Sequence, residues 1–203
     1  MEIREKIMIA AQDIFGRMGF KQTTMDEVAR AAGVSKKTLY EQFSSKRELI
    51  FDLVEYYMGM VLKQCEEIVA TTSNPIETIL KIDHMITKSH QNVNPMALME
   101  LQRFFPESFN LFRTNLMKND VVLMKENIEK GIKEGYYRKS INPEIIAKMR
   151  IENAMMVVCN NLMVTDRIDH LSLKKELMEH FMYGIMTPKG VEYYQKHKSQ
   201  YYK

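Results

Sequence analysis

The sequence predicts an all-α fold. Apolar residues recur at spacings of three and four along most of the 203 residues, which is the pattern of helices with one buried face. Ser, Thr and Asn stand where helices begin, and Gly or Pro stand where they end or restart. No stretch alternates apolar and polar residues for long enough to form a strand.

The first predicted helix spans residues 2–18, because Ile7 and Ala11 recur on one apolar face. A second helix starts after Thr24. Thr24 and Glu27 have the spacing of a capping box, in which a hydroxyl and a carboxylate satisfy free N–H groups at a helix start.

A tight turn follows at Gly33, in the place where a chain reverses through a left-handed residue. Ser35 can cap the next helix, in which Leu39 and Phe43 are four residues apart and face inward. Two short helices joined in this way form a helix-turn-helix, whose natural partner is the major groove of double-stranded DNA.

The outward face of the second motif helix carries cations, hydroxyls and an amide. Such groups suit phosphates and base edges, so we expect Lys36 and Lys37 to read bases and Thr24, Tyr40 and Lys46 to contact phosphates. The alternative is an ordinary helical hairpin with solvated lysines. The full set of expected DNA contacts is Thr24, Ser35, Lys36, Lys37, Thr38, Tyr40, Gln42 and Lys46.

A long fourth helix is expected from Lys46 to Ala70, opened by a second capping box of Ser45 and Glu48. Proline, asparagine and serine mark the later helix starts. These later helices are expected over residues 75–90, 95–105, 106–135 with a break near Asn119, 142–165 and 172–184.

Residues 7–51 resemble the DNA-binding domain of the TetR family of bacterial transcriptional regulators. Gln42 departs from the pattern, because many members carry histidine or tyrosine there. The matching residues are Ala10-Ala11, Phe15, Gly19-Phe20, Thr23-Thr24, Val28-Ala29, Ala32-Gly33-Val34-Ser35, Thr38-Leu39-Tyr40, Phe43, Lys46 and Leu49. The resemblance implies a homodimer that binds operator DNA and a small-molecule effector.

The last two long helices carry more apolar surface than one buried face requires. One stripe would pack in the domain and the other against a second copy, as the resemblance implies for a four-helix dimer interface. The alternative is that both stripes belong to the core of one monomer. The expected interface residues are Met149, Met156, Cys159, Met163, Leu177 and Phe181.

The middle of the chain is rich in methionine and aromatic residues, which form cores and also line adaptable apolar pockets. The resemblance implies a small-molecule pocket there. The candidate ligand contacts are His84, Arg103, Met60, Phe104 and Met124. His84 and His90 are six residues apart, a poor spacing for one helix face, so no metal site is expected. No cofactor is expected.

The domain division that follows is a helix-turn-helix domain over residues 1–47, a helical regulatory and dimerisation domain over residues 48–188, and a basic tail over residues 189–203. We expect the tail to be solvated, because its basic and tyrosine-rich sequence has no sustained amphipathic pattern. The two cysteines lie in apolar helical contexts and are expected to be buried free thiols.

The net charge is +3, and the basic excess lies in the two ends of the chain. No apolar run reaches the length of a membrane span, and the N-terminus lacks the apolar core of a signal peptide. A cytoplasmic protein without a membrane partner is therefore expected.

No catalytic motif stands out, so an enzyme is not expected. The favoured hypothesis is a homodimeric repressor that an apolar or amphipathic ligand releases from its operator. The alternative of the same fold is an effector-free DNA-binding protein, for instance a nucleoid-associated factor. The third hypothesis is an α-helical enzyme or ligand carrier in which the helical hairpin resembles a DNA-binding motif by coincidence.

Overall fold

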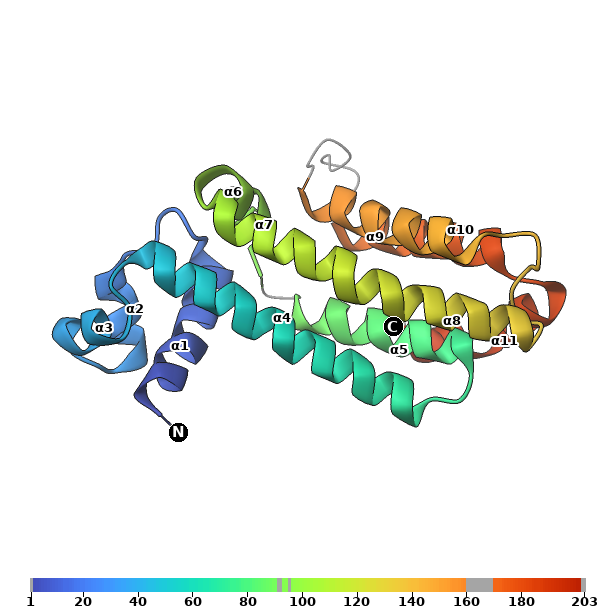
Figure 1. Ribbon diagram of the computed structural model, residues 1–203, viewed down its shortest axis with the longest axis horizontal. Coiled ribbons are helices and arrows are strands. Elements are labelled where there is room, and N and C mark those ends of the chain that lie inside the picture. Colours follow the sequence, from blue (N-terminus) through green and yellow to red (C-terminus); the bar gives the residue numbers. More distant parts are fainter. Residues whose placement is uncertain (1, 91–92, 95, 160–169, 202–203) are drawn as a thin grey trace. The chain divides into compact units, whose positions relative to one another are not determined.

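The computed structural model describes residues 2–90, 93–94, 96–159 and 170–201, and within these ranges the chain is α-helical without strands (Figure 1). The N-terminal helices are α1 (Ile3–Met18), α2 (Met25–Ala32), α3 (Lys36–Gln42) and α4 (Lys46–Thr71). The central helices are α5 (Pro75–Ser89), α6 (Ala97–Phe104), α7 (Pro106–Asn115) and α8 (Val121–Lys133). The last helices are α9 (Pro143–Cys159), α10 (His170–Ile185) and α11 (Pro188–His197). The all-α prediction is confirmed.

The break expected near Asn119 is a π-helical turn over Leu116–Asp120, between α7 and α8. The N–H of Val121 bonds to the carbonyl of Leu116, five residues back, so the chain stays helical through the turn. The end of the helix expected over residues 142–165 lies outside the described residues. None of the described helices combines the length and apolar character needed to cross a membrane.

The chain divides into two compact units. The first consists of Met1–Met60 and Gln91–Thr114, and the second of Val61–His90 and Asn115–Lys203. The long helix α4 contributes to both. A segment from the middle of the sequence therefore belongs to the same unit as the helix-turn-helix.

The first unit is held together by a core that α1 to α4 share and by contacts from the segment around α6. The N–H of Asn94 donates to the carbonyl of Gly16 at 2.6 Å, and Glu100 accepts from the N–H of Lys21 at 2.9 Å. The fully buried core residues of this unit include Ile7, Ala11, Val28, Leu39, Phe43, Leu49 and Ile50.

The second unit packs α5, α8, α9, α10 and α11 around one apolar cluster, and α8, α9 and α10 run side by side in Figure 1. The most deeply buried members of the cluster are Ile76, Leu80, Ile128, Tyr137, Ala147, Met182 and Tyr194. Gly131 permits this packing, because a Cβ there would lie 2.0 Å from the ring of Tyr137.

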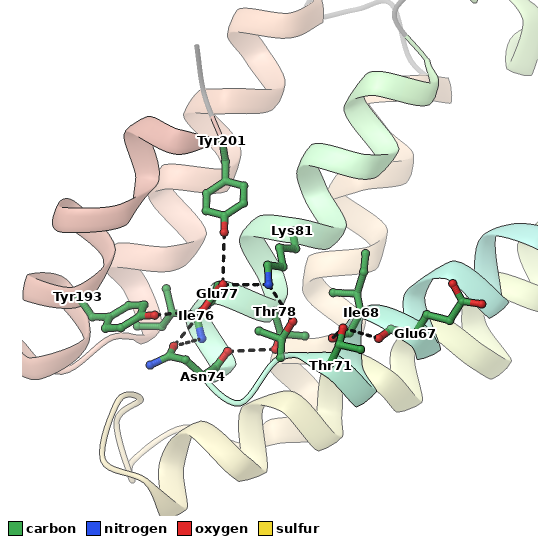
Figure 2. A network of polar contacts seen from close by, with 11 residues as sticks. Glu67, Ile68, Thr71, Asn74, Ile76, Glu77, Thr78, Lys81, Tyr193 and Tyr201 are labelled. Atoms are coloured by element: carbon green, nitrogen blue, oxygen red, sulfur yellow. Dashed lines mark hydrogen bonds and ion pairs between the residues drawn. The ribbon is translucent and has the colours of Figure 1, made fainter.

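The expectation of a solvated C-terminal tail is wrong. Thr187 caps α11, whose Tyr194 is fully buried in the second unit. Figure 2 shows that Tyr193 and Tyr201 both reach the Glu77 carboxylate near the start of α5, with oxygen separations of 3.2 and 3.5 Å. The free energy gained by burying the tyrosine rings holds this segment against the second unit, although the segment is basic. Its charged groups stay on the outer side of the segment.

Candidate nucleic-acid interface

The first motif helix, α2, begins with the expected capping box. The N–H of Thr24 donates to the Glu27 carboxylate at 2.7 Å, and the N–H of Glu27 donates to the Thr24 hydroxyl at 3.3 Å. The backbone hydrogen bond from Thr24 holds the pKa of Glu27 below its usual value. The Thr24 hydroxyl also donates to Glu27, so this proton would have to turn away from Glu27 to reach a phosphate.

The turn between the motif helices is a Schellman motif. Gly33 has φ 61° and ψ 39°, the left-handed region in which glycine carries no side-chain penalty. Its N–H donates to the carbonyl of Arg30 at 3.1 Å, and the N–H of Val34 donates to Ala29 at 3.0 Å. These bonds fix the direction in which the chain enters α3.

The second motif helix, α3, starts at Ser35, whose hydroxyl accepts from the N–H of Thr38 at 3.0 Å. Leu39 and Phe43 are fully buried and anchor the helix on the first unit. The opposite side of α3 faces solvent: the Lys37 side chain is 88% exposed and Tyr40 is 43% exposed. The sequence therefore assigned the inward and outward residues correctly at these positions.

On the outward face of α3, the side chains of Thr38 and Gln42 are half-buried. The backbone carbonyl of Gln42 accepts from Arg4 at 2.7 Å. The Arg4 guanidinium also lies 4.2 Å from the centre of the Phe43 ring and pairs with Asp52. Sequence reasoning missed Arg4, because its partners are 38 and 48 residues away and no local pattern marks them.

The two lysines at the start of α3 differ in their surroundings. The Lys36 ammonium lies 2.8 Å from Asp26 of α2, and the hydrogen bond between them raises the Lys36 pKa. The Lys37 ammonium lies 3.9 Å from Glu41 and is otherwise open to solvent. Lys37 is therefore the more available of the two cations.

Lys46 lies in the first turn of α4, as expected, but its ammonium is turned toward the protein. It donates to the carbonyl of Lys21 at 3.2 Å and lies 5.6 Å from the centre of the Phe105 ring. Burial lowers its pKa, and the carboxylates of Glu100 and Glu27 oppose that shift. A phosphate contact from Lys46 requires this side chain to rotate outward.

The second expected capping box is formed only in part. Ser45 accepts from the N–H of Glu48 at 3.2 Å, as predicted. The Glu48 carboxylate, however, accepts from the N–H of Ser44 at 2.8 Å, one residue before the position that a capping box requires. Ser44 offers Glu48 both its N–H and its hydroxyl, which explains the shift.

The candidate ligand contacts are divided between the two units. Met60, Arg103 and Phe104 belong to the first, and His84 and Met124 to the second. Arg103 is exposed, with its guanidinium 5.5 Å from the centre of the Phe104 ring. His84 is also exposed, and its Nδ1 lies 2.9 Å from the carbonyl of Tyr201. Met124 packs against the core cluster of the second unit.

The expected interface residues have different surroundings. Met149 of α9 is 43% exposed, and Ile145, one turn earlier, is 63% exposed. Phe181, in contrast, is only 3% exposed and packs in the core of its own chain, so its assignment to a contact between protomers is wrong. Met156 and Leu177 are half-buried. The side chain of Cys159 and all of Met163 lie outside the described residues.

Comparison with known proteins agrees with this geometry. Residues 7–53 match the sequence family described as bacterial regulatory proteins, tetR family. The transcriptional repressor KstR2 of Mycobacterium tuberculosis is 22% identical over 146 residues, which cover 70% of this chain and 73% of that protein.

Solved structures share the fold over almost the whole chain. Escherichia coli NemR in its reduced form has a TM-score of 0.74 at 16% identity, over 92% of this chain and 99% of its own. Bacillus subtilis FadR in complex with stearoyl-CoA has a TM-score of 0.65 at 18% identity, over 89% of this chain and 98% of its own.

The helix-turn-helix geometry and these matches establish that the chain belongs to the TetR family. It is a DNA-binding transcriptional regulator. The resemblance found in the sequence is confirmed.

Proposed function

We propose that this regulator is a homodimeric repressor that binds a two-fold symmetric operator and leaves it when an apolar or amphipathic small molecule binds. Residues 1–47 read the DNA, and residues 48–188 dimerise and bind the ligand. The single observation that carries the DNA-binding part is the outward face of α3. Lys37 and Tyr40 are exposed there, while Leu39 and Phe43 fix the helix from behind.

We assign base reading chiefly to Lys37, because its side chain is 88% exposed, against 62% for Lys36. Lys36 joins it once its pair with Asp26 opens. Thr24 and Tyr40 position the motif on phosphates, together with Lys46 after an outward rotation. Ser35, Thr38 and Gln42 complete the interface, and their hydrogen bonds hold α3 in place.

Exposed apolar residues of α9 support the dimer. Ile145 and Met149 present an aliphatic stripe to solvent, and a second copy would cover it. Two helix-turn-helix heads related by a two-fold axis match two half-sites about 34 Å apart on the DNA. The effector part is supported by a relative of the same fold, FadR, which was solved with stearoyl-CoA.

The test begins with selection of binding sites from random DNA, followed by anisotropy titration of the selected site. We expect an inverted repeat and a dimer per site. The variant K36A/K37A should lose specific binding, whereas K133A/K139A, which removes the same charge from exposed lysines of the second unit, should not. Equal binding of K36A/K37A and wild type to the selected site would show that the assigned face is wrong.

Ligand control is tested separately, by thermal shift against lipophilic compounds and by titration of each hit with and without operator. Linkage requires operator DNA to weaken ligand binding by the factor by which the ligand weakens DNA binding. A compound that binds equally in both titrations is not the effector, because it shifts no equilibrium.

A further inference from the structure

A carboxylate without a counter-charge lies in the second unit, at the π-helical turn between α7 and α8. Asp120 is the last residue of this turn and is half-buried. Among the described residues, none forms a hydrogen bond or an ion pair with its carboxylate. Burial is the only cause that shifts its pKa, to about 6, so no described cation offsets the cost of its charge.

The backbone explains why Asp120 has no local partner. An aspartate just before a helix normally accepts a hydrogen bond from a free N–H of the first turn. Asp120 instead has helical torsions of φ −71° and ψ −33°, and its side chain makes no capping hydrogen bond. The helix continues through the π turn, and the N–H of Val121 is bonded to Leu116. Turns of this kind are frequent at functional sites.

Three uncharged side chains, those of Cys65, Met117 and Met124, lie near Asp120 in space or along its helix. Cys65 of α4 is 2% exposed, and burial, followed by the nearby charges of Asp120 and Glu66, raises its pKa to about 12. The thiol is therefore neutral and a weak donor. Met117 and Met124, one turn on either side of Asp120, are half-buried against the core cluster. Thioether and thiol groups adapt to ligands of irregular shape.

A negative charge in an apolar, partly open setting has one strong complement, which is a cation with an apolar body. We propose that Asp120 is the polar anchor of a ligand site and selects molecules that carry a protonated nitrogen on a hydrophobic frame. The ammonium or amidinium group donates to the Asp120 carboxylate, and the hydrophobic part lies over Met117 and Met124. Ligands with a carboxylate or phosphate head are repelled. The role of this site as the effector site rests on the proposed function.

The experiment compares decylamine, decanol and decanoate, which share an apolar chain and differ in the head group. Calorimetric titration at pH 7, below micelle-forming concentrations, is made with wild type and the near-isosteric variant Asp120→Asn. The matched control is Glu126→Gln, which removes an exposed carboxylate from α8. We expect wild type to bind decylamine at least about tenfold more tightly than decanol, the factor that about 1.4 kcal/mol represents, and decanoate most weakly.

In Asp120→Asn the preference for the amine should disappear, whereas decanol binding stays the same. Glu126→Gln should retain the preference. The inference is overturned if wild type binds none of the probes, binds decylamine and decanol equally, or keeps its preference in Asp120→Asn. A different result concerns the proposed function alone. If decylamine binds through Asp120 but does not weaken operator binding, the ligand site is supported and the proposed release of the repressor from its operator is contradicted.

Discussion

The ammonium of Lys36 lies 2.8 Å from Oδ1 of Asp26, so the first cation of α3 is paired with α2. Both side chains are more than half exposed, so the pair contributes little to stability. Its effect on DNA binding is expected to be larger, because the Asp26 carboxylate holds Lys36 away from the base edges and repels the phosphates of the DNA backbone.

We therefore expect Asp26→Asn to tighten binding to all DNA sequences by a few fold, because the phosphates are no longer repelled by this carboxylate, and to steepen the salt dependence by about 0.9 in log–log slope, the value of one phosphate charge. Anisotropy titrations over a series of salt concentrations measure both. Asp13→Asn is the control, since Asp13 is an exposed, arginine-paired carboxylate of α1 in the same unit. Equal effects of the two variants would mean that only net charge matters.

Removal of the hydroxyl group is expected to have opposite effects on the stability of the fold at two buried tyrosines of the second unit. The Tyr137 hydroxyl donates to Asn127 at 3.2 Å, whereas the buried Tyr194 hydroxyl has no hydrogen-bond partner among the described residues. Tyr137→Phe should destabilise the fold by about 1 kcal/mol, and Tyr194→Phe should be neutral or stabilising. Urea unfolding compares the two, and a larger loss in Tyr194→Phe would contradict the packing of α11.

The dimer proposal predicts that charge on the exposed stripe of α9 separates the protomers. Ile145→Glu with Met149→Glu places unpaired carboxylates in the proposed contact, at a cost of several kcal/mol. Sedimentation at micromolar concentration should report a folded monomer. Val69→Glu, which charges an exposed valine of α4, should remain dimeric. Phe181 is unsuitable for this test, because a charge there would disrupt the core of each protomer.

The Asp120 carboxylate should make the fold less stable as pH rises. Burial raises its folded pKa to about 6 from the ordinary 3.8, so the folded state binds the proton more tightly than the unfolded state. The contribution of this carboxyl group to the free energy of unfolding is fully present below its unfolded pKa of 3.8. It is lost as the pH rises through its folded pKa of about 6. Asp120→Asn should therefore stabilise the protein at pH 7.5, by at most about 3 kcal/mol.

Thermal unfolding of wild type and Asp120→Asn between pH 4 and pH 8 measures this difference. The two curves should approach each other near pH 4, where the wild-type carboxyl is protonated in the folded state. A constant difference over the whole range would show that Asp120 keeps the same pKa in the folded and unfolded chain.

Local chemistry accounts for what the sequence predicted well. The caps at Thr24 and Ser35 and the turn at Gly33 depend on residues within a few positions, so their spacing was sufficient. Tertiary contacts account for the errors. Arg4 finds its partners far along the chain, and Phe181 lies on one of two apolar stripes that periodicity alone cannot assign to its own core or to a partner.

Because the first unit consists of two separate segments of the chain, its DNA-binding domain cannot be exchanged between regulators as one N-terminal piece. A chimera joined after the helix-turn-helix, at residue 47, would discard the segment around α6, and with it the bonds from Asn94 to Gly16 and from Lys21 to Glu100. A transplant that keeps its native fold must carry two separate inserts, Met1–Met60 and Gln91–Thr114. In this regulator, the unit that can be transferred to another protein is therefore defined by its tertiary contacts and not by one continuous segment of the sequence.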